Sequence, residues 1–127
     1  SPKPLRSCMA FVLKQSDTYV WPITFDIPVD GGRHERQTLD GEFKRHPQSK
    51  IGPMVAELQK LEDLGDLERI TEMAADLLVG WSGVTGDDGK EIPFSQKALH
   101  QLLEVPFLAV AVLKSYMDSI KGAKRKN

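Results

Sequence analysis

Apolar residues at every odd position between 19 and 29 constrain the fold of this chain more than any other feature. A period of two places alternate residues on opposite faces of a β-strand. Pro22 and Pro28 cannot donate hydrogen bonds to a β-ladder, so we expect this strand to have an edge side or a bulge. The stretch therefore predicts a half-buried strand. Its apolar face consists of Tyr19, Trp21, Ile23, Phe25, Ile27 and Val29.

The next stretch predicts a hairpin. Residues 30–32 read DGG, and glycine adopts positive φ without steric cost. The returning arm, residues 33–45, places Leu39, Gly41 and Phe43 on one face and polar residues on the other. We expect these residues to form a second strand, antiparallel to the first.

A third strand is predicted upstream of the hairpin. Residues 8–15, CMAFVLKQ, are rich in apolar and β-favouring residues, and Ser16-Asp17 offers a short turn. The connections between the three strands are too short for a crossover. The sequence therefore predicts an antiparallel β-meander.

From residue 46 onward the apolar period becomes helical, and glycine or proline interrupts it at several points. Proline is tolerated in a first helical turn, whose N–H groups have no helical partner. We expect a first helix that starts near Gly52-Pro53 and stops at Leu64-Gly65, and a second from Asp66 to about Val79. A third helix is expected from Gln96 to Leu103. The last should start at or near Pro106 and end before Gly122.

Local signals define the last two of these helices. Ser95 is a good N-cap, and Phe94 and Leu99 occupy the two positions of a hydrophobic staple. Phe107 opens a broad apolar face that continues to Ile120, wide enough for a central core helix.

Together these elements predict an α+β fold, with an N-terminal three-stranded antiparallel β-meander packed with a C-terminal bundle of about four α-helices. The chain has 127 residues, of which 40% are hydrophobic, as expected for one domain with a single core. Within this single domain, 1–127, we distinguish a loose arm (1–7), the β-meander (8–45), the helical part (50–121) and a basic tail (122–127).

Composition disfavours several classes of function. The formal net charge of −1 gives no global field toward nucleic acid or an anionic membrane. No apolar run approaches the roughly 20 residues that a transmembrane helix requires. The single Cys8 fits a reducing cytosol, and we interpret it as a buried thiol rather than a nucleophile. The first 13 residues lack the cleavage site of a signal peptide, so we expect a cytoplasmic protein.

Motifs for catalysis and metal binding are also missing from the sequence. The histidines at positions 34, 46 and 100 do not have the spacing of zinc ligands. There is no Gly-rich phosphate loop, nucleophile elbow or paired-carboxylate signature. We therefore expect no catalytic residues, no metal and no cofactor.

The loop at residues 79–95, VGWSGVTGDDGKEIPFS, holds four of the ten glycines. Residues 87–89 resemble part of a calcium loop, but the alternating ligands and the closing glutamate are missing, so a turn is favoured. Trp81 suits two roles. It either fills a corner between two pairs of helices or belongs to a docking surface.

Three segments carry a further pattern: GEFKRHPQSKI (41–51), GWSGVTGDDGKEIPFS (80–95) and SYMDSIKGAKRKN (115–127). They contain an F-K-R-x-P element before the helices, a W-x-G-V loop that closes on I-P-F-S, and a basic ending. In this combination the chain resembles the tail assembly chaperones of long-tailed phages and prophages. The likeness spans nearly the whole chain, although Gly52-Pro53 departs from the usual uninterrupted helix start.

The resemblance implies a non-enzymatic protein that coats the phage tape measure protein until tail tube subunits replace it. It also implies self-association, because a small protein must cover a long client many times. The tail tube protein is a second candidate partner. The expected location is the host bacterial cytoplasm, and the protein should be absent from the mature virion. The candidate partner-binding residues are Trp81, Val84, Phe94 and Phe107.

Two alternatives stay open. The first is a structural tail or head–tail joining protein that remains in the virion. The second is a small nucleic-acid-binding regulator that uses residues 33–36 and the cations of the tail. The tail cations also complement the dipole of the last helix, and with a net charge of −1 this makes nucleic acid the less favoured partner. These cations are Lys121, Lys124, Arg125 and Lys126.

Overall fold

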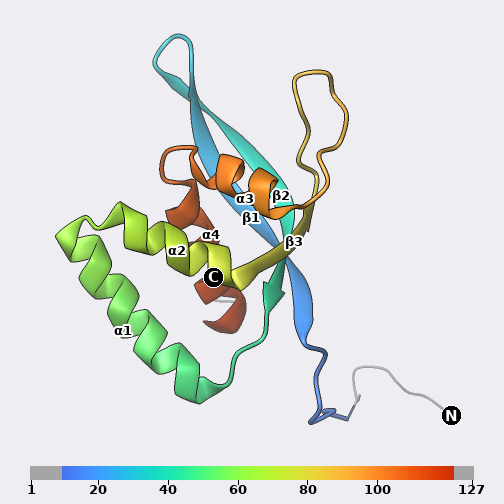
Figure 1. Cartoon of the computed structure of the whole chain (residues 1–127), viewed down its shortest axis with the longest axis vertical. Helices are drawn as coiled ribbons and strands as arrows, with labels where there is room; N and C mark the ends of the chain where they lie inside the picture. Colours follow the sequence, from blue (N-terminus) through green and yellow to red (C-terminus); the bar gives the residue numbers. More distant parts are fainter. Residues whose placement is uncertain (1–9, 122–127) are drawn as a thin grey trace, which may run out of the picture.

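The chain folds into a three-stranded antiparallel sheet and four helices, which confirms the predicted α+β class (Figure 1). The structure is a computed structural model and describes residues 10–121, so the predicted arm, Cys8 and the basic tail lie outside the described residues. In chain order the elements are β1 (Thr18–Val29), β2 (Arg33–Lys44), α1 (Gln48–Leu64), α2 (Leu67–Leu77), β3 (Leu78–Ser82), α3 (Gln96–Leu103) and α4 (Leu108–Lys121).

The predicted hairpin is confirmed. β1 and β2 pair without interruption from Thr18↔Lys44 to Val29↔Arg33. Gly31 and Gly32 both have positive φ in the turn. The odd-numbered residues of β1 lie toward the core, and the even-numbered residues from Val20 onward are exposed.

β1 is an edge strand, as its prolines predict. Pro22 and Pro28 are six residues apart, so their nitrogens face the same side of the strand. Because the ladder with β2 is uninterrupted, that side is the outer edge. A strand that paired with this edge would find two N–H donors missing on β1, and this protects the edge from pairing.

The predicted third strand at residues 8–15 is wrong within the described residues. Residues 10–15 form no strand, and Phe11, Val12 and Leu13 are exposed. The third strand is instead β3, which pairs with the free side of β2 and lies between α2 and α3 in the chain. The prolines on the outer edge of β1 give a physical reason why the third strand pairs with β2 instead of β1. Between residues 10 and 45 the structure therefore holds one hairpin instead of the predicted meander.

The first helix begins earlier than predicted. α1 starts at Gln48, so Pro53 lies inside the helix rather than near its first position. The C-terminal boundary is correct, because Gly65 ends α1 in the left-handed conformation with φ 69°.

The later helix boundaries follow their caps, with two corrections. Ser95 Oγ accepts a hydrogen bond of 3.0 Å from Ala98 N, which confirms the predicted N-cap of α3. α2 ends at Leu77 rather than near Val79, because the chain there enters β3. α4 begins at Leu108, two residues after Pro106.

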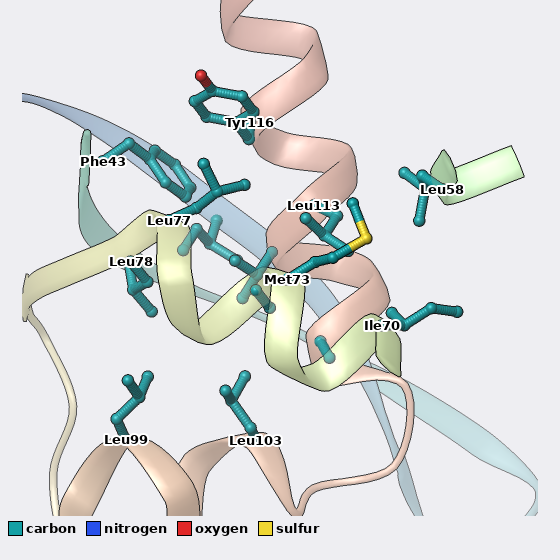
Figure 2. Packing of buried hydrophobic residues seen from close by; sticks show 14 of the residues in the cluster. Phe43, Leu58, Ile70, Met73, Leu77, Leu78, Leu99, Leu103, Leu113 and Tyr116 are labelled. Carbon is teal, nitrogen blue, oxygen red and sulfur yellow. The ribbon is translucent and has the colours of Figure 1, made fainter. Parts of the chain in front are cut away.

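The core lies between the helices and the inner face of the sheet (Figure 2). The rings of Phe43 and Tyr116 meet edge to face with their centroids 5.4 Å apart, and Leu77 and Leu113 belong to the same buried cluster. Gly41 is required on this face, because a Cβ there would lie 2.6 Å from Ile23 Cδ1.

Among residues 10–121, no single helix has the length and apolar composition to cross a membrane. α3 and α4 together meet both criteria, but they are bent by 102°.

Candidate partner-binding site

The loop after β3 is closed by its own aromatic residues. Trp81 Nε1 donates a hydrogen bond of 2.8 Å to the carbonyl of Ile92. Ile92 N in turn donates to the carbonyl of Val84 at 2.7 Å. The rings of Trp81 and Phe94 meet edge to face with their centroids 5.0 Å apart. Three predicted site residues, Trp81, Val84 and Phe94, are thus brought together and half-buried, an arrangement that favours a structural corner.

The acidic tip of this loop is a turn, as its sequence predicts. Asp88 Oδ1 accepts a hydrogen bond of 3.0 Å from Lys90 N. Gly89 has φ 78°, and its N–H donates to the carbonyl of Gly86. Between residues 10 and 121, no cluster of histidine, cysteine, aspartate and glutamate side chains has an arrangement suited to a metal ion.

Phe107, the fourth predicted site residue, lies on a different surface. It was expected to open the buried face of the last helix, but its side chain is 72% exposed. Residues 105–108 form a turn closed by a hydrogen bond of 3.1 Å from Leu108 N to Val105 O. Pro106 takes the second position of this turn, and Phe107 takes the third with φ 63°.

This is the pattern of a type II turn, whose third position favours glycine because φ is positive there. A non-glycine residue in the left-handed region costs roughly 1–2 kcal/mol. The conformation holds the Phe107 ring outside the core while its carbonyl accepts a hydrogen bond from Ala111 N at the start of α4. The structure therefore places an exposed aromatic side chain at a strained backbone position.

Phe107 borders a groove between the edge strand β1 and α4, lined by both apolar and polar residues. The groove has a volume of ≈ 640 Å³. Asp26, Lys114 and Asp118 are among its polar lining residues. Its main apolar lining residues are Trp21, Phe25, Ile27, Phe107, Val110 and Ala111.

The sequence named Phe107 as a candidate partner-binding residue but did not predict the groove beside it. Trp21 and Phe25 were assigned to the core face of β1, and both pack against the core while remaining partly exposed. Their position on an edge strand was predictable from Pro22 and Pro28. The signal for the turn was Pro106 directly before an aromatic residue, since proline favours the second position of such turns.

Comparison of the chain with protein-family models, curated proteins and solved structures gave no match. The geometry of the groove and the sequence resemblance are therefore the basis for a functional proposal.

Proposed function

We propose that this protein is a non-enzymatic phage tail assembly chaperone. It binds the tape measure protein in the bacterial cytoplasm and keeps it soluble until tail tube subunits displace it. The observation that carries the proposal is Phe107, exposed and held at φ 63° beside a groove that is partly lined by apolar side chains. The three sequence segments that resemble tail assembly chaperones supply the identity of the client.

The energetics of Phe107 favour a role in binding. Its conformation costs roughly 1–2 kcal/mol in the free protein. Because the ring is 72% exposed, little burial offsets this cost. Strained positions of this kind concentrate at sites that contact ligands. Contact with a partner would provide the missing burial.

The groove suits one side of an amphipathic helix. Such helices bind in hydrophobic grooves through apolar side chains at three- and four-residue spacing. A tape measure chain is long and helical, and its apolar stripes need to be covered before assembly. The groove between β1 and α4 offers Trp21 and Phe25 on one wall and Val110 on the other.

Co-expression with a phage tape measure protein, a long coiled-coil protein, tests the proposal. The wild-type chain should keep that protein in the soluble fraction and co-purify with it. Phe107→Asn should weaken co-purification, because it removes the ring. The same change should leave thermal stability equal or higher, since asparagine tolerates the left-handed conformation.

Val20→Asn is the matched control. Val20 is 64% exposed on the solvent face of the sheet, so its replacement should change neither solubility nor co-purification. If the wild-type chain leaves the coiled-coil protein insoluble, the chaperone function is wrong. If Phe107→Asn binds as well as wild type, the function stands but the groove is not its site.

A further inference from the structure

A second hollow, of ≈ 510 Å³, opens at the N-terminal end of α1. It lies where β1, the residues after β2 and the C-terminal half of α4 meet. Its principal lining residues are Tyr19, Arg45, His46, Gln48, Tyr116 and Ser119.

The start of α1 has free hydrogen-bond donors, and its first residue, Gln48, lines the hollow. The N-cap is Pro47, which makes no side-chain cap, and no acidic residue lies in the first turn. Within residues 10–121, the amides of Gln48 and Ser49 donate to no acceptor. The positive end of the helix dipole is therefore uncompensated by any described side chain.

Four basic residues surround this helix end: Lys44, Arg45, His46 and Lys50. In the described part of the chain, none of them lies within 4.0 Å of a carboxylate. The backbone carbonyl of the nearby Asp17 accepts a hydrogen bond of 2.9 Å from Arg45 N, and the Asp17 carboxylate forms no ion pair with Arg45.

Arg45 is held in place by a ring rather than by an acid. Its guanidinium carbon lies 4.8 Å from the centroid of the Tyr19 ring. Burial, followed by the charges of Lys50 and Lys44, lowers the pKa of His46. Positive charge from Lys44, Arg45 and Lys50 is thus concentrated here without a counter-ion from residues 10–121, while His46 favours its neutral form.

Tyr116 adds an independent observation. Its side chain is only 1% exposed, yet its hydroxyl makes no hydrogen bond with any residue from 10 to 121. The hydroxyl points away from the leucines of the core in Figure 2, and the residue lines the hollow. Burial, with the neighbouring Tyr19, raises the pKa of Tyr116 to about 12, so the hydroxyl remains a donor. By contrast, Tyr19 Oη pairs with Ser119 Oγ at 2.7 Å.

We infer that this hollow binds a carboxylate from an acidic segment of a partner protein, through Arg45, the free amides of α1 and the Tyr116 hydroxyl. Each of these groups donates hydrogen bonds, and together they match the oxygen atoms of a carboxylate. The link to the tape measure protein rests on the proposed function, whereas the anion site does not.

Two observations favour a protein carboxylate over the phosphates of a nucleic acid. The face of Tyr19 is covered by Arg45, and Tyr116 is buried, so neither ring offers a free face on which a base could stack. Trp21 lines both this hollow and the Phe107 groove. One protein segment along the seam between β1 and α4 can therefore contact both.

Binding of two short peptides, measured by NMR, tests this inference. One is an acetylated and amidated peptide of alanine and glutamate, and the other has glutamine in place of every glutamate. The glutamate peptide should shift the amides of Gln48 and Ser49 and raise the pKa of His46. The glutamine peptide should do neither.

Variants then test the donors. Arg45→Gln should weaken binding of the glutamate peptide by about tenfold or more, because it removes a charge-assisted hydrogen bond. Tyr116→Phe should also weaken binding, but without lowering the free energy of unfolding, since the hydroxyl has no described partner to lose. Lys60→Gln is the charge-matched control on the exposed side of α1 and should change binding less than about twofold.

Three results would overturn the inference. The first is equal binding of the two peptides. The second is unchanged binding after either Arg45→Gln or Tyr116→Phe. The third is that inorganic phosphate or a single-stranded oligonucleotide binds at the same amides as tightly as the glutamate peptide does.

Discussion

Replacing Gly41 by alanine should destabilise this fold through overpacking. Gly41 lies opposite Trp21 on β1 and Trp81 on β3, on the inner face of the sheet. An alanine Cβ would lie 2.6 Å from Ile23 Cδ1 and 2.9 Å from Leu78 Cδ1. Both neighbours are fully buried, so neither side chain is able to swing into solvent. We expect a loss of about 2–3 kcal/mol, the upper part of the range for overpacked cores.

A double-mutant cycle separates this clash from a general effect of the substitution. Ile23→Val removes the Cδ1 atom that the new Cβ would meet. Alone, Ile23→Val should lower the free energy of unfolding by about 0.5–1.5 kcal/mol. In the Gly41→Ala background, Ile23→Val should lower it clearly less or even raise it, giving a coupling energy of about 1 kcal/mol. Rescue should be incomplete, because the contact with Leu78 remains.

Urea unfolding followed by far-ultraviolet circular dichroism measures these values, provided that the m-value is unchanged. Two other glycines serve as controls. A Cβ on Gly80 meets Glu42 Oε1, the end of a flexible side chain, so alanine there should cost less than at Gly41. A Cβ on Gly52 meets nothing within 4 Å, so alanine in α1 should stabilise by about 0.5–1 kcal/mol. Equal costs at Gly41 and Gly80, or no coupling with Ile23, would refute the reasoning.

Two further predictions concern single side chains. Trp81→Phe should lower the free energy of unfolding by about 1 kcal/mol, because the carbonyl of Ile92 loses its donor. Trp81→Ala should lower it by about 3 kcal/mol; equal values in urea unfolding would mean that the ring itself contributes nothing to stability. For His46, burial and the charges of Lys50 and Lys44 lower the pKa in the folded state, so the unfolded chain binds more protons just below pH 6.5. The free energy of unfolding should therefore fall as the pH drops from 6.5 through the folded-state pKa, and His46→Gln should flatten this dependence; an unchanged pH profile would contradict it.

The parts of the fold that depend on local chemistry could be predicted from the sequence. The period of two in β1 follows from the alternation of its side chains, and its edge position follows from Pro22 and Pro28. The α3 boundary follows from Ser95, whose hydroxyl caps the helix. Gly65 ends α1 because few other residues adopt its left-handed conformation without strain.

The parts that depend on tertiary pairing could not be predicted. Leu78–Ser82 continues the apolar run of α2, and only pairing with β2 makes it a strand. The segment around Phe11 has the composition of a strand, but residues 10–15 pair with no other strand. The sequence pattern predicts Phe107 as the first residue of an apolar helix face. Its exposure is decided by the turn at Pro106, one residue before it.

The two proposed contact regions lie along one structural feature, the seam between β1 and α4. Phe107 precedes the first turn of α4, and Tyr116 lies nine residues later, about 14 Å along a helix at 1.5 Å per residue. A partner helix lying on this seam would need an apolar residue at one end and an acidic residue two to three turns away. The apolar end supplies burial that salt leaves intact, while the contact with Arg45 is weakened by screening. If the protein binds such a client, charge would set the direction in which the client lies, and the Phe107 groove would set how tightly it is held.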